Sequence, residues 1–163
     1  MPLAGARISA FIQPLIDAME EFGITTPARR SAFLAQVAHE SGELRYTREL
    51  ADGSAYEGRP DLGNTEPGDG PRFRGRGLLQ VTGRNNYGRC GIALGLELLE
   101  HPELLEVPGG ACRSAGWFWR GHGLNEAADR NRFGTITRTI NGGYTHLDER
   151  LGYWLAARKA CGL

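Results

Sequence analysis

The stretch from Phe33 to Glu49 limits the possible folds of this chain more than any other. Its apolar side chains recur at the spacing of one helical face, which predicts burial in a core; they are Phe33, Leu34, Val37 and Ala38. Glu40 follows three positions after Val37, close to this buried face. Burial raises the pKa of a carboxyl group and favours its protonated form. The sequence therefore predicts a core helix that carries a candidate general acid, Glu40.

A second carboxylate, Glu49, comes nine positions after Glu40 and follows a short polar connection. A return of the chain would bring it across a cleft from Glu40. Two carboxylates in different environments are the pattern that glycoside hydrolysis uses. Two alternatives stay open: Glu40 as a structural ion-pair partner, for example of Arg150, and Glu57 as the second carboxylate.

Length and charge exclude several classes of protein. The 163 residues fit one domain, 1–163. Lys plus Arg and Asp plus Glu are both 19, so no nucleic-acid partner is expected. No apolar run approaches the roughly 20 residues of a membrane span. The first helix is interrupted by polar residues, which argues against a signal peptide and predicts synthesis in a cytoplasm; they are Arg7, Gln13, Asp17 and Glu20.

Other motifs are incomplete. The segment His39–Glu43 resembles the start of a zinc-protease helix, but position 43 is Glu where a second His is needed. Gly75-Arg76-Gly77 lacks the third glycine of a dinucleotide fingerprint. The odd, widely spaced cysteines predict buried free thiols rather than a disulfide framework; they are Cys90, Cys112 and Cys161. We therefore expect no metal and no cofactor.

The remaining pattern is mainly helical. Periodicity and capping signals predict five to seven helices, among them 6–21, a helix from Thr26 that carries Glu40, 84–94, 109–121, parts of 125–140, and about four turns from Leu147. The stretch from Ala51 to Gly77 is rich in glycine and proline and predicts a long functional loop. Alternation in Leu78–Thr82 predicts a short run with one polar face.

Separated blocks of sequence resemble glycoside hydrolase family 19, the chitinase-like enzymes, and occur in the family's order. They are Ala32–Gly42, Phe73–Thr82, Asn85–Gly88, Trp117–Trp119, Ile140–Gly143 and Asp148–Tyr153. Tyr56–Thr65 with Pro67–Gly70 is similar to the family's bacteriophage and prophage endolysins. The chain lacks the longer cleft loops and the several disulfides of the plant chitinases.

This resemblance implies a mainly α, lysozyme-like α+β fold with two lobes, a catalytic cleft and an inverting mechanism. It implies Glu40 as general acid, Glu49 as general base, and Thr82 as the hydroxyl that helps to hold the attacking water. The implied or candidate substrate-binding residues are Tyr46, Tyr56, Gln80, Asn86, Asn141 and Arg150. One departure is that Tyr144-Thr145 stands where the chitinases place a glutamate.

The expected activity is that of an endolysin, a glycosidase that hydrolyses β-1,4 bonds of the peptidoglycan glycan strand. We expect a monomer, made in a bacterial host cytoplasm without a signal peptide and acting on the wall after release, for example through a holin. The alternatives are a chitinase acting on chitin oligomers and a non-catalytic cell-wall binding module. Arg74 and Arg76 either meet acidic groups of the substrate or satisfy carbonyls of the glycine-rich loop.

Overall fold

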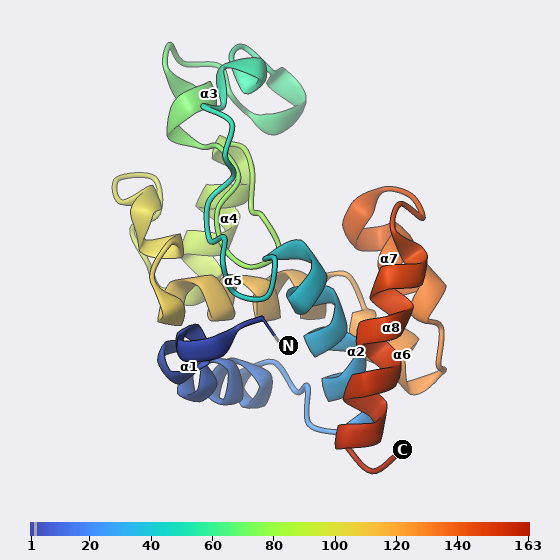
Figure 1. The fold of residues 1–163 in the computed structure, drawn as a ribbon. Coiled ribbons are helices and arrows are strands. Elements are labelled where there is room, and N and C mark those ends of the chain that lie inside the picture. Colours follow the sequence, from blue (N-terminus) through green and yellow to red (C-terminus); the bar gives the residue numbers. More distant parts are fainter. Residues whose placement is uncertain (2) are drawn as a thin grey trace.

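The computed structural model describes Met1 and residues 3–163 and is mainly helical, as predicted (Figure 1). Its α-helices are α1 (Ile8–Glu21), α2 (Pro27–Glu40), α3 (Asp69–Arg72), α4 (Arg84–Leu94), α5 (Pro108–Gly121), α6 (Leu124–Asp129), α7 (Phe133–Asn141) and α8 (Leu147–Ala160). Short 3-10 helices cover Gly5–Arg7, Ser54–Tyr56, Pro60–Leu62 and Pro102–Leu105. The expected helix boundaries hold to within a few residues, but the described residues form eight α-helices rather than five to seven. The additional ones arise because α3 lies within the expected loop and the stretch 125–140 is divided between α6 and α7.

Helix α2 lies at the centre of the body and packs against α8, while α1 packs against α5 (Figure 1). Phe33 of α2 meets Trp119 of α5 edge to face, with ring centroids 5.3 Å apart, and both side chains are fully buried. The start of α2 follows the predicted cap, since the Thr26 side chain accepts a hydrogen bond from the Arg29 N–H. The core thus fixes the helix that carries Glu40.

Apolar periodicity predicted the helix over 6–21, but only half of its six apolar positions from Ile8 to Met19 are buried. Phe11, Leu15 and Met19 are buried, but Ile8, Ile12 and Ile16 are 38%, 54% and 41% exposed. The helix packs mainly against a single neighbour, α5, which covers a narrower arc than six apolar side chains span.

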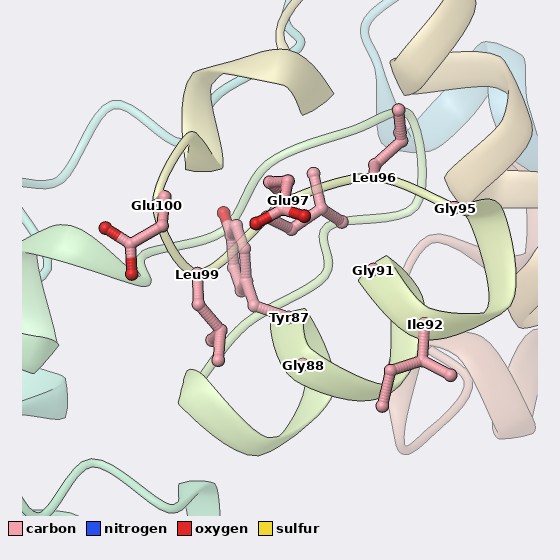
Figure 2. A pocket seen from close by; sticks show the side chains of 10 residues that line it. Tyr87, Gly88, Gly91, Ile92, Gly95, Leu96, Glu97, Leu99 and Glu100 are labelled. Atoms are coloured by element: carbon pink, nitrogen blue, oxygen red, sulfur yellow. The ribbon is translucent and has the colours of Figure 1, made fainter.

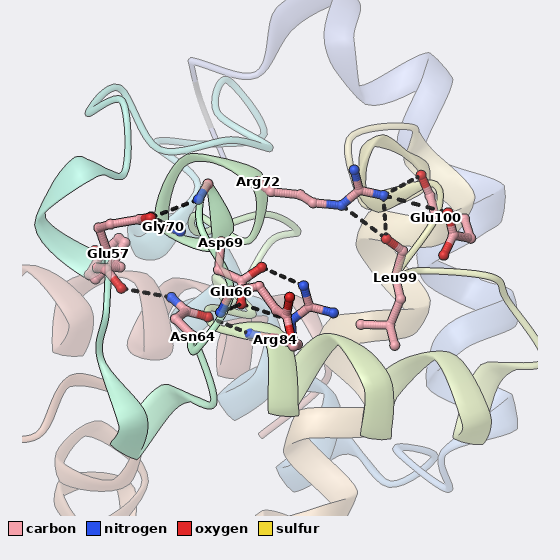
Figure 3. Close-up of polar contacts among 11 residues, drawn as sticks. Glu57, Asn64, Glu66, Asp69, Gly70, Arg72, Arg84, Leu99 and Glu100 are labelled. Carbon is pink, nitrogen blue, oxygen red and sulfur yellow. Dashed lines mark hydrogen bonds and ion pairs between the residues drawn. The ribbon is translucent and has the colours of Figure 1, made fainter.

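The segment from Ala51 to Gly83 contains only two 3-10 turns and the four-residue helix α3. Polar contacts within the segment and to α4 hold it in place (Figure 3). Asp69, 1% exposed, forms a two-pronged ion pair with Arg84 of α4. The Glu57 carboxylate accepts the N–H groups of Gly68 and Gly70 at 2.7 and 2.8 Å. The expected long loop is therefore an ordered part of the fold.

The run Leu78–Thr82 forms no strand of its own. It belongs to a tight reversal in which Arg76 pairs with both Arg48 and Val81 as isolated bridges. Gln80 has φ +52°, which breaks an extended run. The predicted sidedness survives, because Leu78, Leu79 and Val81 are buried while Gln80 and Thr82 are half-buried.

The cysteines carry no disulfide. Cys90 and Cys112 are buried, and burial raises the pKa of each thiol to about 12, whereas Cys161 is only half-buried. Among the described residues, no helix has both the length and the hydropathy needed to cross a membrane.

Candidate active site

Glu40 is the last residue of α2, and its carboxylate lies against the guanidinium of Arg150 on α8. The distance from Arg150 Nη1 to Glu40 Oε1 is 2.6 Å, and Arg150 is 1% exposed. The contact is an ion pair without hydrogen-bond geometry, since Glu40 Oε1 has no hydrogen-bond partner among the described residues. The sequence predicted burial of Glu40; the structure adds a cation directly beside its carboxyl group.

A residue that the sequence did not single out, Gln36, holds Arg150 in place. Gln36 is fully buried, accepts from Arg150 Nη1 at 2.6 Å, and donates to Thr137 Oγ1 of α7 at 2.8 Å. Arg150 Nε donates to the carbonyl of Thr145 at 3.3 Å. The signal that could have revealed Gln36 is an amide on a helical face that is otherwise apolar, one turn before Glu40. Three helices therefore fix the Glu40 carboxylate.

His39 lies next to this network. Its Nδ1 is 3.4 Å from Glu149 Oε2. Burial lowers the pKa of His39, and the charge of Arg150 lowers it further. The lowered pKa favours the neutral form of His39 beside Glu40.

A left-handed turn after α2 sends the chain back toward Glu49. Gly42, Glu43 and Leu44 all have φ between +55° and +66°, a conformation that is costly for the two non-glycine residues. The buried Glu43 carboxylate supports the turn by accepting from Tyr153 Oη at 2.9 Å and from the Leu3 N–H. Glu43 is therefore a structural carboxylate.

Glu49 is held by the loop segment rather than by helices. Its Oε2 accepts the Gly75 N–H at 2.8 Å and the Tyr56 hydroxyl at 3.2 Å. Its own N–H donates to the Gly75 carbonyl at 3.0 Å. Burial raises the pKa of Tyr56, and the Glu49 carboxylate adds to this, so the phenol keeps the proton that it donates.

Three predicted site residues converge on Gly75. A Cβ atom on Gly75 would lie 2.4 Å from Gln80 Oε1, 2.6 Å from Glu49 Oε2 and 3.3 Å from Thr82 Oγ1. A carboxylate, an amide and a hydroxyl therefore share one small volume, which only glycine leaves open. The cluster places hydrogen-bonding groups directly beside the Glu49 carboxylate.

The other predicted binding residues lie at different distances from this cluster. Asn86 contacts it directly, as Nδ2 donates to the Thr82 carbonyl at 2.8 Å. Tyr46 lines a cavity of about 310 Å³ together with Glu49. Asn141, at the end of α7, is exposed and forms no side-chain hydrogen bond with the other candidates in the described part of the chain.

Two further alternatives from the sequence can be placed. Glu57 is engaged with backbone N–H groups of the loop, so it acts as a brace there. Arg76 is 6% exposed and binds Glu106, the Tyr87 hydroxyl and the Arg72 carbonyl, which makes it a structural residue.

A larger cavity of about 490 Å³ lies elsewhere, beside α4 (Figure 2). Glycines and leucines dominate its lining, which also includes Glu97 and Glu100. None of the predicted site residues lines it. Among residues 1 and 3–163, no three His, Cys, Asp or Glu side chains gather closely enough to hold a metal ion.

Comparison with known proteins identifies the family. The sequence model of the family described as "Chitinase class I" matches residues 22–130, which include Glu40, Glu49 and Thr82. The chain belongs to glycoside hydrolase family 19. Its relatives include a family 19 domain-containing protein of Haemophilus influenzae, 29% identical over 88% of this chain and 85% of that protein. An endochitinase of Arabidopsis thaliana is 33% identical over 93% of this chain.

The folds agree as well. Chitinase C of Streptomyces griseus matches with a TM-score of 0.73 and 26% identity, over 92% of this chain and 69% of that chain. The lysozyme-like helical fold of family 19 is thereby confirmed, and the family's chitinases indicate that this protein is a glycoside hydrolase. The chain spans only 56% of the length of the Arabidopsis endochitinase.

Proposed function

We propose that this family 19 protein is an endolysin that hydrolyses β-1,4 bonds of the peptidoglycan glycan strand by an inverting acid–base mechanism. The observation that carries the mechanism is the separate mounting of two carboxylates. Glu40 stands on a buried helix beside Arg150, and Glu49 stands in a loop beside the hydroxyl of Thr82 and the amide of Gln80.

In this mechanism Glu40 protonates the oxygen of the leaving sugar as the glycosidic bond breaks. Glu49 takes a proton from a water molecule that attacks the anomeric carbon from the opposite face. The Thr82 hydroxyl orients that water. The Gly75 N–H and the Tyr56 hydroxyl hold the Glu49 carboxylate in position before the reaction, so little reorganisation is needed during it.

The stereochemistry of the first product tests this mechanism. An inverting enzyme needs room for water between base and sugar, with its carboxyl groups roughly 6.5–9.5 Å apart, whereas a retaining enzyme holds them about 5–5.5 Å apart. We expect the wider separation, at least when substrate closes the cleft, and an α-anomer as the first product. Proton NMR of a fresh digest, read before mutarotation, measures this; an initial β-anomer would exclude the mechanism.

Two features support the choice of peptidoglycan. The sequence segment Tyr56–Gly70 resembles the endolysins, and the cysteines are free, unlike the disulfide-bonded cysteines of the plant chitinases. We propose that the protein reaches the wall after release from the cytoplasm. Mass spectrometry of digested, purified peptidoglycan gives the sugar at the new reducing end and so the bond that is cut. Intact strands after incubation would contradict the proposal.

A chitinase is the second candidate, because the Arabidopsis relative and the Streptomyces structure carry that name. A chitinase would release reducing ends from chitin oligomers but not from purified glycan strands. Both substrates therefore belong in one assay at equal sugar concentration.

A further inference from the structure

The cavity beside Glu49 is lined by arginines that the acid–base mechanism does not use. It measures about 310 Å³ and is formed mostly by residues 45–50. Arg45 and Arg48 come from this segment, and Arg74 comes from the glycine-rich loop. Three arginines thus line a hollow that adjoins the candidate base.

The two carboxylates that also line the cavity are already engaged. Glu106 pairs with Arg76 at 2.7 Å and more loosely with Arg48 at 3.5 Å. Glu49 accepts its hydrogen bonds from the Gly75 N–H and Tyr56. Neither Arg45 nor Arg74 takes part in an ion pair in the described part of the chain. The cavity therefore retains cationic groups that can meet an anion.

Arg74 gives the clearest sign of a missing acceptor. Its Nε is buried and has no hydrogen-bond partner among the described residues. Buried donors are nearly always satisfied, so the Arg74 guanidinium is not anchored at this nitrogen by the described part of the chain. The nearby Asp52 is not a hydrogen-bond partner of Arg74. The charge of Arg74 contributes to lowering the pKa of Asp52, but the Asp52 carboxylate is exposed and accepts from the Ser54 N–H at 2.9 Å. Arg45 is oriented by stacking on Tyr46, with its Cζ 5.1 Å from the ring centroid.

We propose that Arg45, Arg48 and Arg74 form a subsite that binds a carboxylate of the glycan substrate next to Glu49. The proposal rests on the function proposed above. A guanidinium binds a carboxylate through two parallel hydrogen bonds, which suits an arginine-lined hollow. Peptidoglycan carries a lactyl carboxylate on alternate sugars where the stem peptide is absent, and peptide carboxylates where it is present. Chitin carries neither, so the subsite would favour the acidic polymer over the neutral one.

Matched substrates test this. Soluble glycan strands without stem peptides are compared with the same strands after carbodiimide amidation of their carboxylates, at constant ionic strength. Strands that keep their peptides form the third arm. We expect amidation to raise KM about tenfold, the effect of losing roughly one charge-assisted hydrogen bond. A preference confined to stem-free strands points to the lactyl carboxylate, and one confined to peptide-bearing strands points to the peptide.

Variants connect the preference to the arginines. Arg45→Ala and Arg74→Ala should each lower the ratio of kcat/KM for native over amidated strands toward one. Arg45 is exposed, so its removal leaves folding intact. Arg130→Ala is the matched control, because Arg130 is also exposed but lies at the end of α6 outside this cavity, and it should keep the wild-type ratio.

The outcomes separate the two proposals. Cleavage of native and amidated strands with equal KM would overturn the subsite and leave the endolysin activity standing. Cleavage of chitin oligomers alone would overturn the endolysin activity. The subsite is then judged by binding of native and amidated strands to the Glu40→Gln protein, where equal affinity would overturn it too.

Discussion

The two candidate catalytic carboxylates are mounted in opposite ways. Glu40 ends a buried helix, and three helices fix it through the fully buried Gln36 and the nearly buried Arg150. Glu49 lies in a half-buried loop and is fixed by a backbone N–H and a phenol. Core packing therefore sets the position of Glu40. The position of Glu49 depends instead on the close approach of the Gly75 backbone to its carboxylate. The two halves should respond differently to mutation.

The largest effect is expected at the helical half. Glu40→Gln removes the transferable proton but keeps the shape of the side chain, so activity should fall at least ~10²-fold while the fold survives. Hydrolysis rates with circular dichroism and a thermal melt measure this. Glu126→Gln, on an exposed part of α6, is the control. Near-wild-type lysis by a folded Glu40→Gln protein would remove Glu40 from the mechanism.

Within the loop half, Glu49 and Glu57 should separate catalysis from support. Glu49→Ala should lower kcat about 10²-fold, as expected for a lost general base. Glu57→Ala should cost about 1 kcal/mol of stability, because two backbone N–H groups lose an acceptor at an exposed site, and should leave most activity. The two variants are compared at equal folded fraction. A larger kinetic loss for Glu57→Ala would mean that Glu57 is the base.

Gly75→Ala tests the crowding around the loop carboxylate. The added methyl would collide with Glu49 Oε2 and Gln80 Oε1, so the carboxylate must shift. Displacement of a catalytic group by about 1 Å can cost up to ~10²-fold in rate, and we expect a loss of kcat within that limit. Gly109→Ala in α5 is the control, since nothing lies within 4 Å of its Cβ. Equal activity of the two variants would contradict this picture.

The last effect is on stability rather than on the reaction, and it concerns the anchor of the loop. Asp69→Asn breaks the pair with Arg84, at a cost of about 2 kcal/mol, because Asp69 is buried but Arg84 is one-third exposed. Hydrogen bonding to Arg84 lowers the pKa of Asp69 below its ordinary 3.8. The pair therefore contributes its full stability above pH 3.8 and loses it as the pH falls through the lowered pKa. Urea unfolding of both proteins at pH 7 and pH 2 measures this. A gap that does not shrink at pH 2 would contradict it.

Local signals in the sequence were enough for the helices. Thr26 and Pro27 began α2 as predicted, and α4 ended where Gly95 provides the left-handed cap. The exposed Ile12 shows the limit, because apolar periodicity does not reveal how many neighbours a helix has. Local sequence signals therefore predict where a helix forms. Which of its side chains are buried depends on chain segments that are distant in sequence.

The candidate site was predictable only in part, for the same reason. The contact between Glu40 and Arg150 was foreseen as one possible ion pair, and the structure forms it. Gln36 and Gly75 were missed, because their roles arise from chain segments that are distant in sequence. The roles of Glu40, Glu49 and Thr82 in the reaction stay predictions.

The pairing of α2 with α8 has a consequence for protein synthesis. Gln36 and Arg150 are 114 positions apart, so a ribosome adding about 5–20 residues per second needs on the order of ten seconds between them. During that interval both candidate carboxylates exist, but Glu40 lacks its cation and one flank of α2 is uncovered. The contacts around Glu40 therefore cannot form before translation has supplied α8. The order in which the parts of the chain emerge thus makes this half of the candidate site a late product of synthesis.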